Sequence, residues 1–178
     1  MKTEFDLQPT LHGTLLTAQP LQTNDFEELF SAASDPKIWE QHPNPLRYQR
    51  EVFRNFFDGA IASGGAFLLR ENNSQRAIGS SRFYDYDPEK SRILIGYTFL
   101  ACTFWGGFYN GELKKIMLDH AFQFVDNVHF HIGSQNIRSQ IAMERLGGFK
   151  VDEINVPYYG EKSTLNFIYE INKDNWRR

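Results

Sequence analysis

The order of helix-like and strand-like patterns predicts a layered α/β (α+β) domain with a mixed sheet of about seven strands and about four helices. Three consecutive strand patterns with short connections, near 66–70, 76–84 and 91–101, indicate an antiparallel meander. After them the apolar period changes from two to 3.6 residues, and a strand pattern returns at 128–132. This change predicts a parallel, right-handed strand–helix–strand crossover between residues 92 and 132.

Local signals indicate the other elements. A strand is expected at 15–18, and Asn24 with Glu27 three residues later resembles a capping box that begins a helix ending near Ala33. A short helical turn is expected at 35–40, a proline-rich loop at 42–45, and a second helix at 52–61 that ends at Ser63-Gly64-Gly65. A helix at 136–146 and strands at 149–155 and 165–171 complete the chain.

Two apolar patterns predict which faces are buried. In the helix that follows Trp105, one side is expected to carry Tyr109, Leu113, Ile116, Met117, His120 and Phe124. The last strand alternates, so that one face is expected to carry Leu165, Phe167, Tyr169 and Ile171.

Composition indicates a single domain, residues 1–178, in the cytoplasm. Hydrophobic residues make up 41% of the chain, and no apolar run approaches the ~20 residues of a membrane helix, so no membrane partner is expected. The formal charge of −3 disfavours a general nucleic-acid binder. The lone cysteine, Cys102, excludes an internal disulfide and a cysteine metal cluster. The mixed-charge start of the chain does not resemble a signal peptide.

The densest functional signal is the segment from Trp105 to Glu112, between a strand and a helix. Gly106, Gly107 and Gly111 allow close approach of the backbone to a ligand, and the first N–H groups of the helix favour a phosphate group. The alternative is a glycine-rich loop that only turns the chain. The spacing matches neither the dinucleotide-binding fingerprint nor the P-loop.

Two blocks resemble a known family. Residues 95–101 (IGYTFLA), Trp105-Gly106 and residues 109–114 (YNGELK) resemble the acetyl-CoA segment of GNAT N-acetyltransferases, particularly the RimJ/RimL branch that acetylates ribosomal-protein N-termini. Residues 136–147 (NIRSQIAMERLG) resemble that branch's second motif. The resemblance extends over nearly the whole chain, and the order of elements is similar to that of the GNAT fold.

The resemblance implies how acetyl-CoA is bound. Two central strands separate, and the pantetheine arm lies in the gap. The backbone near Leu100 would bond the pantetheine and the acetyl carbonyl, and the segment of Trp105, Gly106, Gly107, Phe108, Tyr109, Asn110 and Gly111 would hold the diphosphate. Asn136 and Ser139 would face the coenzyme. The acceptor amine would attack the thioester directly, and Ser139 would protonate the departing thiolate. No metal is implied.

Departures from the family pattern leave a second hypothesis open. Phe108 stands where the motif has its first glycine, and a ring there that blocks the diphosphate would make the chain a non-catalytic coenzyme A binding or sensing module. On that hypothesis Phe108→Gly tightens coenzyme binding. Met143 stands where many members have a tyrosine acid, and Leu146-Gly147-Gly148-Phe149 has one residue more than the family's Leu-Gly-Phe.

The titratable residues do not identify a general base. Asp85, Asp87 and Glu89 fit turn chemistry. His42 lies in a proline loop, where it either borders the acceptor site or is solvated, and the solvated interpretation is favoured. His120 fits a core position, and His129 with His131 share one strand face without a further metal ligand nearby. Cys102 is expected to be a small packed residue.

Two interpretations remain open for the lysines and arginines near the two motifs. Lys114, Lys115, Arg138 and Arg145 would steer phosphates or lie on solvated helix faces.

Because no general base is evident, an acceptor amine that is already partly neutral at pH 7 is favoured. At pH 7 about a tenth of an α-amine with a pKa of ~8 is neutral, against about one part in 2,500 of a lysine amine. This favours a protein N-terminus or a small-molecule amine. Exposed aromatic residues are compatible with a homodimer.

Overall fold

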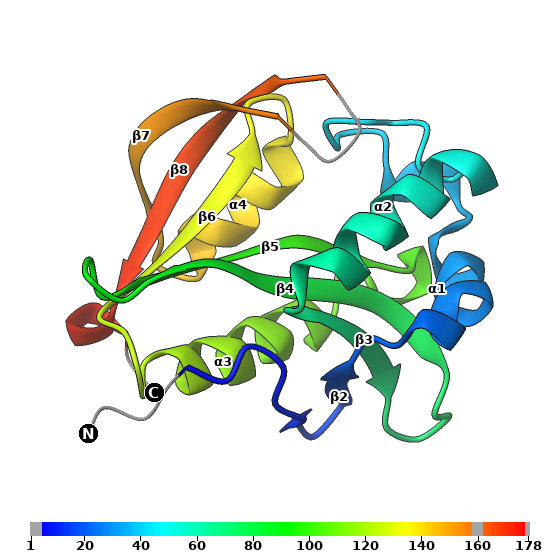
Figure 1. Cartoon of the computed structure of the whole chain (residues 1–178), viewed down its shortest axis with the longest axis horizontal. Helices are drawn as coiled ribbons and strands as arrows, with labels where there is room; N and C mark the ends of the chain where they lie inside the picture. The colour runs from blue at the N-terminus through cyan, green and yellow to red at the C-terminus, as the bar shows by residue number, and fades with distance from the viewer. Residues whose placement is uncertain (1–4, 158–161, 177–178) are drawn as a thin grey trace.

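In the computed structural model, which describes residues 5–157 and 162–176, eight strands form one mixed sheet in the order β1-β2-β3-β4-β5-β6-β8-β7 (Figure 1). All neighbouring strands are antiparallel except β5 and β6, which are parallel. The strands are β1 (Leu11–His12), β2 (Leu16–Pro20), β3 (Ala66–Glu71), β4 (Ala77–Asp87), β5 (Arg92–Leu100), β6 (Asn127–Gly133), β7 (Phe149–Val156) and β8 (Thr164–Asn172). The α-helices of the described residues are α1 (Phe26–Ala33), α2 (Arg50–Ser63), α3 (Tyr109–Ala121) and α4 (Ile137–Arg145).

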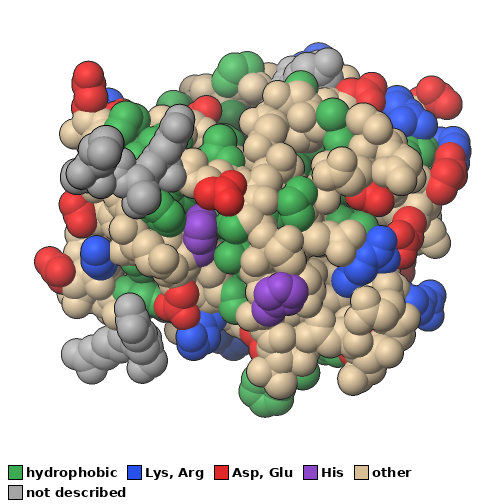
Figure 2. Space-filling view, turned by 60° about the horizontal axis from the view of Figure 1, so that its bottom comes forward, with side chains coloured by type: hydrophobic (Ala, Val, Ile, Leu, Met, Phe, Trp, Pro, Cys, Tyr) green, Lys and Arg blue, Asp and Glu red, His purple; other side chains and the backbone are tan. Residues whose placement is uncertain are grey.

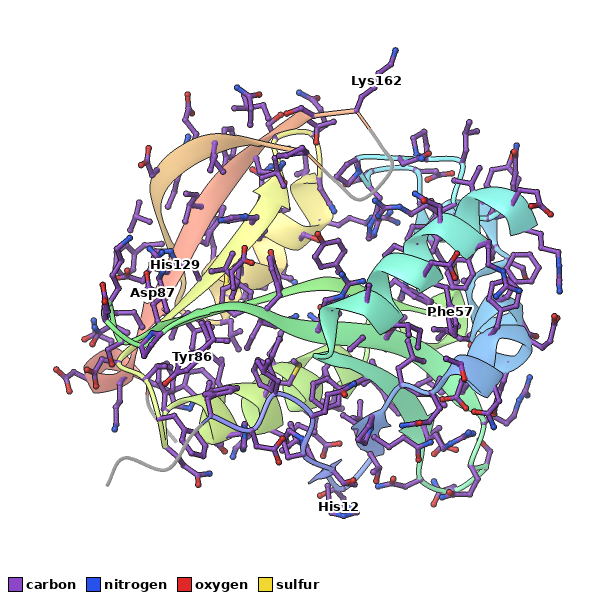
Figure 3. All side chains as sticks on the ribbon, viewed as in Figure 1. His12, Phe57, Tyr86, Asp87, His129 and Lys162 are labelled. Atoms are coloured by element: carbon purple, nitrogen blue, oxygen red, sulfur yellow. The ribbon has the colours of Figure 1, made fainter. Side chains whose placement is uncertain are left out.

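The sheet separates two apolar clusters, so that the domain has three layers. One cluster packs Leu113 of α3 and Met143 of α4 against Ile93 and Ile95 of β5. The other packs α1 and α2 against Phe99 of β5. Figure 1 shows α2 and α3 on opposite sides of the central strands, and Figure 3 labels Phe57 on the α2 side. The predicted meander and parallel crossover are confirmed, and the sheet has one strand more than predicted because of the two-residue β1.

The start of α1 differs from the prediction. The capping box is formed by Gln22, which precedes a 3₁₀ turn, and Asp25, the last residue of that turn, rather than by Asn24 and Glu27. The α-helix therefore begins at Phe26, after the turn. The end of α2 is as predicted, because Gly64 has a φ of +63°, a left-handed value that a glycine adopts without steric cost.

Two buried faces also differ from prediction. The buried side of α3 includes Lys114 and Leu118, so the face is rotated from the predicted one. In β8, Tyr169 and Ile171 are buried as predicted, but Leu165 is exposed and Asn166 of the opposite face is fully buried. The Asn166 amide donates to the backbone carbonyl of Thr164. A polar side chain whose hydrogen bonds are satisfied locally can thus take a core position that the alternation assigns to solvent.

One carboxylate fastens the beginning of the chain to α3. The Glu112 side chain accepts hydrogen bonds from the backbone N–H groups of Thr14, Leu15 and Leu16 at 2.8, 2.8 and 3.1 Å. Gly13 lies so close that an added Cβ would be 2.5 Å from the Glu112 carboxylate. These bonds hold the first turn of α3 against the start of β2.

We expect Glu112→Ala to lower the free energy of unfolding by about 2 kcal/mol, because three N–H groups lose a charged acceptor. Urea denaturation monitored by circular dichroism measures the change. Glu89→Ala, which removes an exposed carboxylate from the turn after β4, is the matched control and should change stability by less than about 0.5 kcal/mol. Equal losses in both variants would contradict this role of Glu112.

Candidate functional site

The parallel strands β5 and β6 pair over only three residues and then separate. The paired positions are Arg92–Asn127, Ile93–Val128 and Leu94–His129, although β5 continues to Leu100 and β6 to Gly133. Figure 3 labels His129, the last paired residue of β6, at the end of the sheet where the two strands still lie together. Beyond it the strands open as a wedge (Figure 1).

A bulge in β5 accompanies this opening. Ser80 pairs with Phe99 and Arg82 with Gly96, so Tyr97 and Thr98 together face Ser81. Tyr97 has a φ of +53°, a left-handed value that is uncommon for a residue other than glycine. A bulge bends its strand and redirects its side chains, so β5 turns away from the line of β6.

A cavity of about 460 Å³ occupies the wedge. It runs between the unpaired parts of the two strands, the start of α3 and the start of α4. Its lining includes Gly96, Thr98 and Leu100 of β5, Phe130, His131 and Ile132 of β6, Trp105, Gly106 and Gly107 of the loop, Asn110 and Lys114 of α3, and Asn136, Ser139 and Met143 of α4.

Most of the predicted coenzyme-binding residues meet at this cavity, and three do not line it. Leu100, Trp105, Gly106, Gly107, Asn110, Asn136 and Ser139 line it, whereas Phe108, Tyr109 and Gly111 do not. The Phe108 side chain is 84% exposed, and its φ of −87° is ordinary for a helix start. The ring therefore lies outside the cavity.

The glycine-rich loop is fixed by its tryptophan. The Trp105 indole donates to the Leu100 carbonyl at 2.8 Å, and the Arg138 guanidinium lies 4.4 Å from the Trp105 ring centroid. Gly106, with a φ of +70°, then turns the chain into α3. As residues of the first turn, Tyr109, Asn110 and Gly111 have N–H groups without a helical acceptor, and these point toward the loop.

The Leu100 backbone faces the gap between the strands. The Ala101 N–H donates to the Ile78 carbonyl of β4. Because successive residues of an antiparallel strand point their N–H and C=O groups to opposite edges, those of Leu100 are directed away from β4. The Leu100 carbonyl accepts a hydrogen bond from the Trp105 indole, and the Leu100 N–H is directed into the wedge.

The second motif forms the other wall. The Asn136 side chain caps α4 by accepting from the Ser139 N–H at 3.2 Å, which sets the Ser139 side chain at the cavity. Backbone conformation and steric contact explain why two glycines, Gly147 and Gly148, follow α4. Gly147 has a φ of +96°, and a Cβ on Gly148 would lie 2.6 Å from the Met143 sulfur.

On the α2 side the cavity is bordered by Arg47, Tyr84, Tyr97 and two histidines. Burial, with Arg47 and Arg138 nearby, lowers the pKa of His42 to about 3. Of the two interpretations of His42, the solvated one is wrong, because its ring packs 5.0 Å from that of Trp39 and lies at the border of the cavity. Burial also lowers the pKa of His131. Both imidazoles are therefore mainly neutral at pH 7, and the lowered pKa makes each a weaker base than a solvated histidine, His42 most of all.

Sequence reasoning missed the burial of Lys114. The interpretation as a solvated or phosphate-steering residue does not fit a side chain that is 7% exposed. A signal was present, because Met117, Leu118 and Ala121 follow Lys114 at helical spacings of three, four and seven residues. Lys115, by contrast, is exposed and pairs with Asp119 at 2.6 Å.

The remaining polar candidates have other partners. His129 lies 2.7 Å from the Glu170 carboxylate, and the His120 ring nitrogen is 2.9 Å from the Asp6 carbonyl. Asp87 pairs with Lys90 and Arg92. Burial and Asp35 raise the pKa of the Cys102 thiol, which fits a packed residue. Within residues 5–157 and 162–176, no group of three or more His, Cys, Asp or Glu side chains is arranged to hold a metal ion.

Family comparison agrees with this geometry. The model of the acetyltransferase (GNAT) domain matches residues 16–148, well over half of the 178 residues. The chain belongs to the GNAT acetyltransferase family. It is accordingly an acyltransferase with the GNAT fold, a family that uses acetyl-CoA. A search of the curated proteins finds no match.

Solved structures share the fold at low sequence identity. A GCN5-related N-acetyltransferase from Brucella melitensis is 17% identical, with 99% of this chain and 82% of that chain covered and a TM-score of 0.83. A probable GNAT acetyltransferase from Chromobacterium violaceum has the same identity, coverages of 99% and 90%, and a TM-score of 0.81. Mycobacterium smegmatis RimJ in complex with CoA-disulfide is 14% identical, with coverages of 96% and 90% and a TM-score of 0.73.

The depressed pKa of His42 predicts a pH dependence of stability. The unfolded chain binds a proton near pH 6.5, whereas the folded chain binds it only near pH 3, so stability falls as the pH decreases from about 6.5 toward 3. We expect His42→Gln to flatten this part of the stability curve. Urea denaturation at pH 4, 5, 6 and 7 measures it, with the exposed His12→Gln as the matched control. An unchanged slope in His42→Gln would contradict the assignment.

Proposed function

We propose that this protein is a RimJ/RimL-type N-acetyltransferase that transfers acetyl from acetyl-CoA to a primary amine. The continuous cavity between the separated ends of β5 and β6, which begins at the glycine-rich loop, is the observation that carries the proposal. Acceptors of the proposed reaction are a protein N-terminal α-amine or a small-molecule amine. No metal takes part in it.

The loop and α3 supply the diphosphate site. The N–H groups of the first turn of α3 and the positive end of its dipole attract an anion at the mouth of the cavity. Gly106 and Gly107 have no atom within 4 Å of an added Cβ, so the backbone there is open to a ligand. From this mouth the pantetheine would extend along the unpaired edge of β5.

The reaction would proceed by direct attack. The amine nitrogen attacks the thioester carbon, an oxyanion forms, and the carbon–sulfur bond breaks. The Leu100 N–H, directed into the wedge, suits the oxyanion, and one well-placed donor contributes ~3 kcal/mol. The Ser139 hydroxyl is the proposed proton donor to the thiolate, whose conjugate thiol has a pKa near ~8.5 and so needs only a weak acid.

The acceptor would enter from the α2 side. His131 and Tyr84 border the cavity there, and a neutral histidine suits the removal of a proton from the attacking amine, directly or through water. No strong base is needed for an α-amine, which is the reason to favour N-termini and small amines over lysine side chains.

Features outside the cavity bear on the partners and the location that we propose for the protein. In the described residues no helix is long and apolar enough to cross a membrane. On the face shown in Figure 2, acidic and basic side chains are interspersed rather than gathered into one basic area, which supports an expectation of no nucleic-acid partner. The exposed Ile137, Ile141, Phe149 and Val151 support a homodimer, and the single cysteine is compatible with the cytoplasm.

Isothermal titration with acetyl-CoA tests the coenzyme site. We expect saturable micromolar binding, and we expect Phe108→Ala to change Kd by less than about threefold because the ring lies outside the cavity. Gly106→Ala, which forces an alanine into a left-handed conformation, should weaken binding by about fivefold or more. No heat at millimolar acetyl-CoA would reject the proposal and favour the non-catalytic module.

A screen of amines with a thiol-release readout identifies the acceptor, and Ser139 is then tested on it. We expect Ser139→Ala to lower kcat by about a hundredfold while KM for acetyl-CoA stays nearly constant, because the hydroxyl acts on the departing thiolate. Ser139→Thr keeps the hydroxyl and should retain most of the activity. An unchanged kcat in Ser139→Ala would mean that this residue serves only the first turn of α4.

A further inference from the structure

A buried lysine amine lies in the wall of the cavity. Lys114 is one helical turn beyond Asn110 on α3, and both residues line the cavity. The Lys114 side chain is only 7% exposed, although lysine is among the residues least often buried. Its amine donates to the Thr98 hydroxyl at 2.7 Å, and that hydroxyl is 2.8 Å from the Ser81 hydroxyl.

The charge of this amine has no counter-ion in the described residues. An ammonium group has three N–H donors, and Thr98 takes one of them. No carboxylate pairs with Lys114, and burial alone lowers the pKa of its amine to about 7. A buried cation that lacks an anionic partner is costly, so the position suits an anion brought by a ligand.

The amine lies between Leu100 and the closed end of the wedge. Phe130 directly follows His129, the last residue of β6 that pairs with β5, and the Lys114 nitrogen is 5.5 Å from the Phe130 ring centroid. Thr98 belongs to the bulge of β5. The diphosphate site lies at the other end, at the exposed loop that precedes α3. On the proposed function, the group that reaches the closed end is the acyl group.

An acetyl group ends in a methyl, which would leave the ammonium unpaired against apolar neighbours. An acyl group that ends in a carboxylate would complete the site. We propose that Lys114 binds the distal carboxylate of a dicarboxylic acyl group, so that the enzyme also transfers malonyl or succinyl groups from their coenzyme A thioesters. This inference rests on the proposed function, because it uses the same coenzyme site.

The chemistry of the transfer is unchanged. The amine nitrogen forms a bond to the thioester carbon, the carbon–sulfur bond breaks, and the thiolate gains a proton while the amine loses one. The distal carboxylate takes no part in bond making, and its ion pair with Lys114 holds the thioester at the acceptor.

Succinyl-CoA and butyryl-CoA, which have acyl groups of four carbons each, provide the test. We expect the wild-type protein to prefer succinyl-CoA in kcat/KM by at least about tenfold, and Lys114→Met to abolish or reverse this preference while acetyl transfer persists. Lys114→Arg should retain part of the preference. Lys115→Met, which removes a neighbouring but exposed lysine, is the matched control and should leave the ratio unchanged.

Proton uptake provides a second measurement that needs no variant. At pH 8 an amine with a pKa of about 7 is mostly neutral, and a carboxylate beside it would restore the charge. Titrations in two buffers of different ionisation enthalpy should therefore show uptake of about one proton with succinyl-CoA and none with butyryl-CoA.

Three results would overturn the inference. The first is wild-type protein that transfers butyryl at least as well as succinyl and takes up no proton. The second is Lys114→Met that loses activity equally with acetyl, butyryl and succinyl donors, which would place the amine at the thioester. Both leave the proposed acetyl transfer standing. The third is a protein that binds no acyl-CoA, which would reject the proposed function as well.

Discussion

The early end of pairing between β5 and β6 is the constraint on which the site depends. A parallel pair in the middle of a sheet normally satisfies its backbone groups along its whole length, and here it stops after three residues. The N–H and C=O groups beyond that point need another partner. A pantetheine arm carries amide groups of the same kind, so a ligand of this chemistry can act as the missing strand.

Other features of the fold keep the wedge open. The bulge at Tyr97 and Thr98 turns β5 aside, and Trp105 ties the end of β5 to the loop through the Leu100 carbonyl. The carboxylate of Glu112 fixes the start of α3, and with it the loop, to the edge of β2. The mouth and the closed end of the cavity are thus fixed by separate contacts.

The sequence was sufficient for the elements and the crossover, because apolar periodicity and glycine placement report on local structure. The expectation that the two motifs meet at one site came instead from the family resemblance. The capping box before α1 was misplaced because the box in the structure begins with Gln22, which is not among the residues preferred at a helix start. The burial of Lys114 and Asn166 was missed for a different reason. A polar residue in a strand or helix is interpreted as solvated unless its hydrogen-bond partner is known. The partner of Lys114 is the Thr98 hydroxyl, which the tertiary fold brings close, and the partner of Asn166 is the backbone carbonyl of Thr164 on the same strand. Whether the Phe108 ring blocks the diphosphate site could not be predicted either, because the direction of the ring depends on how the loop enters α3.

Two neighbouring residues of the β5 bulge, Tyr97 and Thr98, both line the cavity. Tyr97 belongs to the apolar cluster beneath α2, whereas Thr98 touches the amine of α3, so neighbouring positions in the chain address opposite faces of the sheet. Neighbouring positions of any strand point to opposite faces of the sheet, so this separation follows from strand geometry alone. On the proposed function, substitutions at these two adjoining codons would alter the acyl side and the acceptor side of the cavity separately during evolution.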